Sequence, residues 1–370
     1  MPEAVKKQNW DYILLLSALC LTGLGLVMLF SASSIMAEKR FGDAYYFLRP
    51  QTIYVLAGLG VMLLIKNIPY QFFTRLSPVI LLMTVVALAL VLVPGLSAKA
   101  GGASRWLRVG PVTFQPSEAA KVALVLHLAF FLAARPQGIR SFTGGLLPHL
   151  IVLGLMVVMI LAEPDLGTAA ILCLLALILF FVGGARMTHL FGLALLAAPA
   201  VYFLIVRYPY RIRRILAFTR PWDDPLDTGY HIIHSFLAFA SGGLTGLGPG
   251  GGRQKLFFLP ECHTDFIFSV IGEELGLVGV AFVAFLFLVL VWRGIAVALD
   301  AYELEGTYLA LGMTMIIGLQ AFLNMAVVVG LVPTKGLALP FFSYGGSAML
   351  VNFAALGMIM NVAAQERPRS

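Results

Sequence analysis

Ten long runs of apolar residues divide this chain of 370 residues, and they constrain its fold more than any other feature. Each run is about as long as a segment that crosses the hydrocarbon core of a bilayer. A segment inside lipid has to satisfy its own backbone hydrogen bonds, so runs of this kind form helices. The sequence therefore predicts an all-α integral membrane protein with about ten transmembrane helices. The runs lie at 12–34, 51–65, 77–94, 117–134, 146–162, 167–184, 188–206, 265–292, 307–332 and 344–362.

The composition supports the same class. Only 12% of the residues are charged and 60% are hydrophobic, whereas a soluble protein carries about 25% charged residues. The net charge of +7 therefore indicates contact with lipid headgroups or with an anionic substrate. We find no nucleic-acid-binding motif, and we do not expect nucleic acid as a partner. The three cysteines give neither a disulfide framework nor a zinc-binding spacing.

The sequence predicts a single polytopic membrane domain over residues 1–370. An even number of spans places both termini on one side, and the basic residues near each end indicate that this side is the cytoplasm. The remaining loops do not follow the positive-inside rule. Between the seventh and eighth helices, residues 207–264 form a long loop that this topology places outside the cytoplasm.

The first apolar run also has a feature of a cleaved signal peptide, because Lys6 and Lys7 precede it. Its apolar core is about 19 residues long, whereas a signal peptide has a core of about 7 to 15. We therefore expect a retained membrane span.

Two polar stretches lie in loops that the topology places outside. Glu163, Pro164 and Asp165 form a tight reversal between two spans, in which Asp165 is expected to cap the next helix. The glycine-rich residues 242–252 can form backbone nests for an anion, although they do not match a phosphate-binding loop. Arginines are also frequent outside, and together these features suggest an outward-facing site for an anion.

A charged pair is predicted inside the fourth span. Pro116 and Ser117 mark the start of a helix, and Glu118 belongs to its first turn. Lys121 lies three residues further on the same face, so the two charges can pair. The pair has two interpretations, a local ion pair that makes burial tolerable or a contact for substrate. We give the two equal weight, because a local pair does not explain the nearby Arg105, Trp106 and Gln115.

A polar cluster at Glu261, His263, Thr264 and Asp265 runs directly into the eighth apolar run. Ionisable groups at this depth have a cost in free energy. The cluster is either a helix N-terminal cap or a functional site. Partial loss of water would make Asp265 a suitable general base. Glu273 and Glu274 follow on the same run and are expected in interhelical packing or a polar cavity.

The last polar stretch, residues 333–347, is predicted to be a loop that re-enters the membrane region. It contributes Ser343 and Tyr344. The chain thus combines cations, glycine-rich loops and a few carboxylates beside an apolar groove. This combination suits a lipid-linked pyrophosphate, in which cations hold the charged head and a carboxylate activates an acceptor hydroxyl. No Ser-His-Asp order, zinc signature or nucleotide-binding loop indicates another chemistry.

Together these motifs resemble the SEDS family of bacteria (shape, elongation, division and sporulation), over nearly the whole chain and in the family's order. Residues 253–256 and 333–337 are more similar to the cell-division branch (FtsW-like) than to the elongation branch (RodA-like). The resemblance rests on residues 102–108, 114–121, 164–168, 210–214, 229–231, 253–256, 259–266 and 343–347.

The resemblance implies a peptidoglycan glycosyltransferase that polymerises lipid II in the bacterial cytoplasmic membrane, with its active site facing outward. Asp265 would deprotonate the 4-hydroxyl of the acceptor GlcNAc, which attacks the anomeric carbon of a second lipid II. Inversion then gives a β-1,4 bond, and undecaprenyl pyrophosphate leaves. The implied substrate-binding residues are Arg105, Glu118, Lys121, Arg211, Arg214, Glu261, His263, Ser343 and Tyr344.

The implied partners are lipid II, the growing glycan strand, a class B penicillin-binding transpeptidase and other membrane proteins of the division or elongation machinery. No cofactor is required by the sequence. A divalent cation, Mg²⁺ or Mn²⁺, is the one candidate, because it would share the pyrophosphate charge, but no metal-ligand spacing identifies its site.

Two alternatives stay open, a lipid II flippase and a scaffold that only activates the transpeptidase. A flippase needs no carboxylate for bond formation, and a scaffold needs no converging charges. The sequence departs from the family at Cys262, where a small or polar residue such as Ala or Arg is expected, and at 248–252, which is unusually rich in glycine and proline.

Overall fold

The computed structural model describes residues 11–100, 103–110, 112–256, 262–334 and 336–365. Eight helices in this part of the chain are long and apolar enough to cross a membrane, and two shorter apolar helices complete the predicted ten. The prediction of an all-α membrane fold is confirmed. The ten helices are α1 (Tyr12–Phe41), α2 (Leu48–Asn67), α4 (Ser77–Val91), α5 (Pro116–Ala134), α6 (Leu147–Ala162), α7 (Leu166–Val182), α8 (Met187–Val206), α11 (Ile267–Asp300), α12 (Leu304–Val328) and α13 (Gly346–Ala363).

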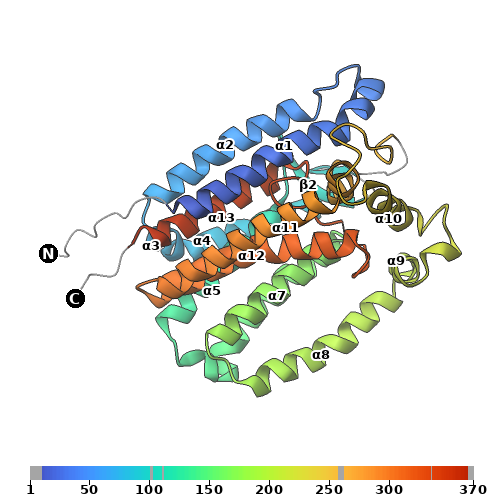
Figure 1. Ribbon diagram of the computed structural model, residues 1–370. Coiled ribbons are helices and arrows are strands. Elements are labelled where there is room, and N and C mark those ends of the chain that lie inside the picture. The colour runs from blue at the N-terminus through green and yellow to red at the C-terminus, as the bar shows by residue number, and fades with distance from the viewer. Residues whose placement is uncertain (1–10, 101–102, 111, 257–261, 335, 366–370) are drawn as a thin grey trace.

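Helices α5, α12 and α13 form the buried centre of the bundle. Leu124 of α5, Met313 of α12 and Phe353 of α13 are completely buried. Helix α2 packs along α13, α1 packs along α11, and α7 packs against α5 and α12 (Figure 1). Helix α1 begins on the left of Figure 1, and helix α13 ends on the same side of the bundle. This arrangement fits an even number of spans.

Helix α8 contacts the rest of the bundle far less than the central helices do. Its side chains Phe191, Leu195 and Leu196 are each at least 70% exposed. Figure 1 shows this helix at the lower edge of the molecule, connected to α7 at one end and leading to α9 (Pro209–Thr219) at the other. Apolar side chains that are this exposed have no favourable environment in water, and lipid supplies one.

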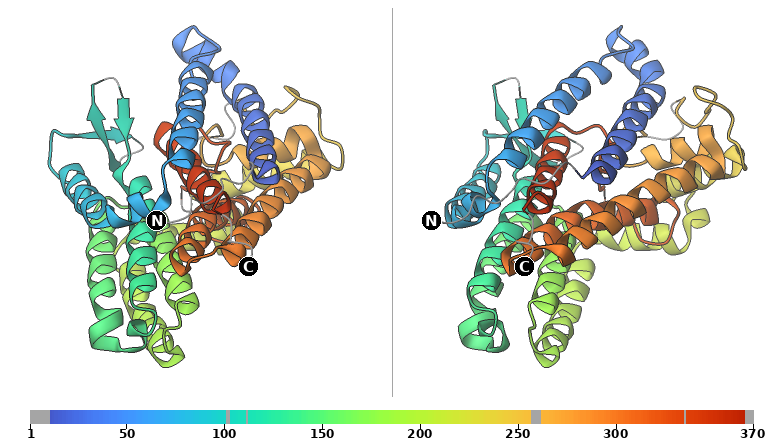
Figure 2. Two further views of the ribbon diagram at one scale, coloured as in Figure 1. Left: turned by 90° about the vertical axis from the view of Figure 1, so that its left-hand side faces the viewer. Right: turned by 60° about the vertical axis from the view of Figure 1, so that its left-hand side comes forward.

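A small antiparallel sheet between α4 and α5 was not predicted. Its strands are β1 (Ser97–Ala100), β2 (Ala103–Val109) and β3 (Val112–Phe114), in the spatial order β1-β2-β3. Figure 2 shows the sheet at one end of the helix bundle, where β2 contacts α4 and α5 and β3 contacts α13. The strands are only three to seven residues long, and the longest, β2, does not alternate polar and apolar residues, so the sequence pattern did not indicate a sheet.

The predicted long loop at 207–264 contains two helices in its described part. After α9, a short 3-10 turn η3 (Pro221–Asp223) leads to α10 (Tyr230–Gly242). Helix α10 packs on α11, and both α9 and α10 lie at the right-hand end of the bundle in Figure 1. The loop is therefore a folded layer at the end of the bundle away from the start of α1. The short elements elsewhere are α3 (Tyr70–Arg75), η1 (Gly138–Arg140) and η2 (Phe142–Leu146).

Helix α11 is interrupted at Gly276, where φ is 65° and ψ is −164°. The residues before the break, 267–274, are buried. The residues after it, 277–300, span roughly 36 Å at 1.5 Å per residue and are long enough to cross a bilayer alone. At the break, the N–H of Leu277 donates to the Gly243 carbonyl at 3.0 Å. The sequence predicted one span at 265–292 and did not predict this division.

Replacing Gly276 with alanine is expected to destabilise the protein. Its φ is strained for any other residue, and a Cβ would lie 2.4 Å from the backbone nitrogen of Gly246. The positive φ alone costs about 1–3 kcal/mol. Thermal unfolding of the purified protein in detergent would show a lower midpoint for Gly276→Ala. Gly60→Ala is the matched control, because a Cβ there meets nothing within 4 Å. Equal midpoints for the two variants would contradict this account of the break.

Candidate active site

Asp265 lies just before α11, in a segment that is held against the loop between α12 and α13. The N–H of Tyr344 donates to the carbonyl of His263 at 3.0 Å. The hydroxyl of Ser343 donates to the carbonyl of Thr264 at 2.5 Å, although these residues are 79 positions apart. The structure therefore brings four predicted site residues together: His263, Asp265, Ser343 and Tyr344.

The main chain of Asp265 is fixed by helix α12. The side-chain Nδ2 of Asn324 donates to the Asp265 carbonyl at 2.9 Å and to the Leu337 carbonyl at 2.5 Å. Gly336 has a φ of +62°, and a Cβ at this position would lie 3.1 Å from Oδ2 of Asp265. The carboxylate thus lies beside a position without a side chain, and Asp265 is only partly buried.

The N-terminal turn of α2 supports the other side of this loop. The ring of Phe47 lies 4.7 Å from the His263 ring and 5.1 Å from the Tyr344 ring, measured between centroids. Gln51 donates from Nε2 to the Ser343 carbonyl at 3.1 Å and accepts from the N–H of Gly345 at 3.2 Å. Helix α2 therefore positions the side of the loop that carries Ser343 and Tyr344.

The predicted pair of Glu118 and Lys121 is present and buried. The Nζ of Lys121 lies 2.8 Å and 2.9 Å from the two carboxylate oxygens of Glu118. Nζ also donates to Oε1 of Gln320 on α12, and Gln320 donates to the Ala338 carbonyl at 3.0 Å. Asn324 lies one turn further along α12, so the charged pair and Asp265 are connected through one face of that helix.

Three buried amide side chains complete this frame, and the sequence analysis did not single them out. Gln51, Gln320 and Asn324 are each at most 2% exposed. Their position inside apolar runs could have identified them in the sequence. Burying an amide there costs free energy unless it forms hydrogen bonds within the protein. Gln320 and Asn324 are also four residues apart, which places them on the same face of one helix.

Arg105 projects from β2 onto the turn between α6 and α7. Its Nε donates to the Glu163 carbonyl at 3.2 Å, and one terminal nitrogen donates to the Pro164 carbonyl at 2.6 Å. Asp165 caps α7 as predicted, since it accepts from the N–H of Thr168 at 3.0 Å and from its hydroxyl at 2.9 Å. This turn therefore fixes the orientation of the Arg105 guanidinium.

The Glu163 side chain has an unusual environment. It is 1% exposed, and neither carboxylate oxygen has a hydrogen-bond partner among the described residues. Burial, and then the nearby charge of Asp165, raise the pKa of Glu163 to about 8, while the Arg105 guanidinium opposes the shift. Glu163 consequently carries a proton at neutral pH.

The contacts found for Arg211 and Arg214 do not reach Asp265. Arg211 is buried, donates to the Tyr210 hydroxyl and the Leu204 carbonyl at 2.9 Å each, and lies 4.6 Å from the centroid of the Tyr208 ring. Arg214 is exposed on the same helix, over the Tyr210 ring. Their role in pyrophosphate binding stays a prediction, and these contacts attach α9 to the end of α8.

One backbone N–H of the glycine-rich stretch 242–252, and two N–H groups just after it, donate to carboxylates of the protein itself. The N–H of Gly250 donates to Oε2 of Glu274 at 3.0 Å. The N–H groups of Arg253 and Gln254 donate to Oε1 of Glu273 at 2.7 Å and 3.2 Å. Both carboxylates are completely buried. They belong to interhelical packing, as predicted, and these three N–H groups are already used by the protein's own carboxylates.

Lys255 balances one of these buried charges. Its Nζ lies 2.6 Å from Oε1 of Glu274 and 2.9 Å from the hydroxyl of Ser31 on α1. Ser31 in turn donates to both oxygens of Glu274 at 2.7 Å. The Lys255–Glu274 pair connects α1, α11 and the residues that follow the glycine-rich stretch. The attraction between the two charges reduces the free-energy cost of burying both.

Glu261, one of the predicted substrate-binding residues, lies outside the described residues. Within the described ranges, no group of three or more His, Cys, Asp or Glu side chains is arranged to hold a metal ion. The predicted divalent cation therefore stays a prediction without a located site.

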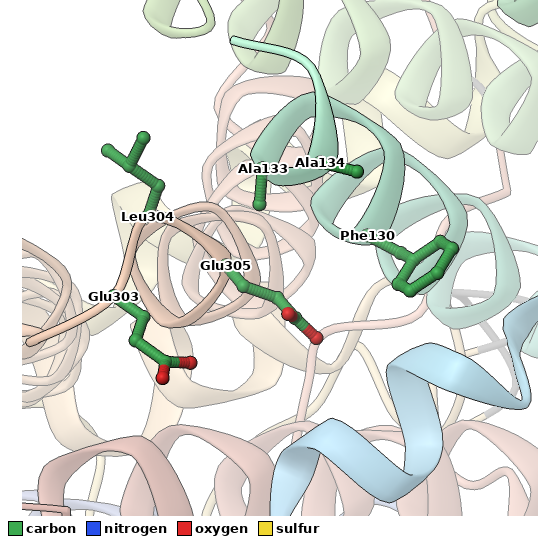
Figure 3. A pocket seen from close by; sticks show the side chains of 6 residues that line it. All are labelled: Phe130, Ala133, Ala134, Glu303, Leu304 and Glu305. Carbon is green, nitrogen blue, oxygen red and sulfur yellow. The ribbon is translucent and has the colours of Figure 1, made fainter.

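The pocket drawn in Figure 3 is unrelated to this site. It has a volume of about 360 Å³ and lies where α5 ends and α12 begins, whereas Glu118 and Asn324 lie toward the opposite ends of those helices. Figure 3 shows the Glu305 carboxylate reaching between the two helices. The lining residues are Phe130, Ala133, Ala134, Glu303, Leu304 and Glu305.

Replacing Glu163 with glutamine should change how stability depends on pH. The folded protein retains a proton on Glu163 up to about pH 8, while the unfolded chain releases it near 4.5. Folded protein therefore binds more protons between these values, and stability falls as pH rises through them. Glutamine does not ionise, so Glu163→Gln does not lose stability in this way. At pH 8.5 its free energy of unfolding should exceed that of the wild type by about 2–4 kcal/mol.

The measurement is thermal or denaturant unfolding in detergent at pH 5.5 and 8.5. Glu38→Gln, which changes an exposed carboxylate of α1, serves as the control and should retain the wild-type pH dependence. An unchanged pH dependence in Glu163→Gln would show that the buried carboxylate is ionised throughout.

Comparison with known proteins identifies relatives over nearly the full chain. The model of the FtsW, RodA and SpoVE cell cycle proteins matches residues 11–368. A probable peptidoglycan glycosyltransferase FtsW of Geobacter sulfurreducens is 47% identical over 358 residues, covering 97% of this chain and 96% of that protein. Stage V sporulation protein E of Bacillus subtilis is 39% identical over 362 residues, covering 98% and 99%.

Solved structures agree. A chain from a peptidoglycan synthase complex that coordinates polymerization and crosslinking has a TM-score of 0.78 and 31% identity, with 96% of this chain and 98% of that chain covered. The rod shape determining protein RodA of Thermus thermophilus has a TM-score of 0.70 and 28% identity, with 96% and 97% covered. These matches confirm the resemblance seen in the sequence, and the chain belongs to the FtsW, RodA and SpoVE family of cell cycle proteins.

Proposed function

We propose that this protein is a peptidoglycan glycosyltransferase that polymerises lipid II, as the name of its FtsW relatives suggests. The observation that carries the proposal is the placement of Asp265. Its carboxylate is partly exposed at the end of the bundle, while its main chain is fixed by a buried hydrogen-bonded frame. A carboxylate on a rigid support suits proton abstraction from a bound hydroxyl.

In the proposed reaction, Asp265 takes the proton of the acceptor's 4-hydroxyl as the oxygen attacks the anomeric carbon of the donor. The new C–O bond forms on the face opposite to the breaking bond, so the configuration inverts. Undecaprenyl pyrophosphate leaves with the electron pair. One base is sufficient, because the pyrophosphate is a good leaving group that needs no proton. His263, Ser343 and Tyr344 lie beside Asp265 and are proposed to contact the sugars.

Positive charge for the pyrophosphate is proposed to come from Arg105, whose guanidinium uses two donors on the turn at 163–164 and has three others in its fork. Lys121 is neutralised by Glu118 and lies deeper, so the pair is proposed to shape the polar interior of the groove. Arg211 and Arg214 would act from the edge of α9. A divalent cation would supply further charge stabilisation.

The proposed setting is the bacterial cytoplasmic membrane, with both termini inside and the active site outside. The match to a chain of a synthase complex supports a class B penicillin-binding transpeptidase as partner, which would crosslink the strands made here. The identity to proteins named FtsW supports a division role over one in elongation.

Replacing Asp265 with asparagine is expected to lower lipid II polymerisation at least about 100-fold, because general-base catalysis contributes on the order of 10²–10⁴. The side chain keeps its size, so folding should be preserved. The measurement is glycan-strand synthesis from purified lipid II by the full-length protein, with and without its proposed transpeptidase partner.

Asp43→Asn is the matched control, because Asp43 lies on the turn between α1 and α2 and pairs with the exposed Arg49. It should retain activity. Full activity in Asp265→Asn would remove Asp265 from the mechanism. If wild type makes no strands but moves labelled lipid II across vesicle membranes, the flippase replaces the polymerase. If neither activity is found and the transpeptidase is still stimulated, the scaffold replaces both.

A further inference from the structure

We infer that Asn324 is a positioning residue for Asp265, which acts on the reaction through the main chain of the base. The inference rests on the proposed function, in which Asp265 is the general base. Its starting point is a single amide nitrogen on α12 that bonds to two separate segments of the site, at the carbonyls of Asp265 and Leu337.

The orientation of this amide is fixed by its partners. Both partners are carbonyl oxygens, which only accept hydrogen bonds, so the NH₂ group has to face them and the oxygen has to face away. Asn324 is 2% exposed. Water therefore has little access to replace these bonds when the side chain is removed.

Helix α11 does not hold the Asp265 carbonyl itself. In a continuous helix, the N–H of Ser269 would donate to that carbonyl, but it donates to the Phe266 carbonyl at 3.0 Å instead. The regular helix starts at Ile267. Asp265 thus lies two residues before the first residue of α11, and Asn324 supplies a bond at this position.

The same amide sets the spacing between Asp265 and the loop after α12. Leu337 follows Gly336, whose missing side chain leaves room for the Asp265 carboxylate. Because one nitrogen bonds to both segments, a shift of either segment changes the distance between the carboxylate and this loop. A misplacement of about 1 Å at a reacting group can cost about 10²-fold in rate.

The bundle contains a second asparagine of the same kind that is remote from the site. Asn361 of α13 donates from Nδ2 to the Ile65 and Lys66 carbonyls at 2.9 Å each, and it accepts from the N–H of Tyr70 at 3.2 Å. It is 3% exposed. It lies near the end of α13, whereas the loop that carries Ser343 precedes this helix. Asn361 is therefore a matched control for the loss of a buried amide.

The experiment measures kcat, KM for lipid II and thermal stability for Asn324→Ala, Asn361→Ala, Asp265→Asn and the double variant Asn324→Ala/Asp265→Asn, in the full-length protein with its proposed partner. Asn324→Ala should lower kcat about 10- to 100-fold and leave KM within about threefold. Asn361→Ala should lower thermal stability and leave kcat per folded protein unchanged.

The double variant separates positioning from general stability. If Asn324 acts through Asp265, removing it from Asp265→Asn should produce no further loss of the residual rate. An equal fold-loss in both backgrounds, or an equal loss of kcat in Asn361→Ala, would overturn the inference. If Asn324→Ala does not fold, Asn324→Asp replaces it, because it has the same size and loses at least one donor.

The outcomes for the two hypotheses are distinct. Full activity in Asp265→Asn would contradict the proposed role of Asp265, whatever Asn324 does. An inactive Asp265→Asn together with a fully active Asn324→Ala would retain the proposed function and reject the positioning role of Asn324.

Discussion

A polar group among membrane helices has to find its partner inside the protein, because hydrocarbon offers none. This constraint explains how the interior of the molecule is built. Lys121 and Glu118 neutralise each other, and Lys121 also donates to Gln320. Lys255 pairs with Glu274 and donates to Ser31. Gln320 and Ser31 come from regions of the sequence far from the charges that they contact, so satisfying these groups also sets which helices lie together. The same bonds position the loops that carry the candidate active site.

The helical fold was predictable because crossing a bilayer demands long apolar runs, and such runs are visible in a sequence. The turn at Asp165 was predictable for a local reason, since a cap is made within three residues. The division of α11 was not, because Gly276 takes its conformation from contacts with residues 243–246, far away in the chain. The sheet at 97–114 was missed because its strands are short and its longest strand, β2, does not alternate polar and apolar residues.

The candidate site was predicted in part, through motifs that group Asp265 with His263 and Ser343 with Tyr344. That these two groups meet depends on hydrogen bonds between distant segments. The amide frame of Gln51, Gln320 and Asn324 was missed, because a single amide in an apolar run does not reveal its partner. The glycine-rich stretch suggested a site for a bound anion, but its neighbourhood binds carboxylates of the protein. Backbone nests bind any nearby anion, and here the anions are Glu273 and Glu274.

The break at Gly276 divides helix α11 into two parts with different surroundings. The part before it, 267–274, is buried among loops and neighbouring helices, and the part after it has lipid-exposed apolar side chains such as Leu277 and Phe285. Bilayers differ in thickness, and membrane helices adapt to the mismatch by tilting. A tilt of the long part pivots at Gly276 and leaves the preceding turns in place. Asp265 precedes the break, so its position is set by its bonds to α12 and by the contact of its neighbour Thr264 with Ser343, and does not follow the direction of the long part.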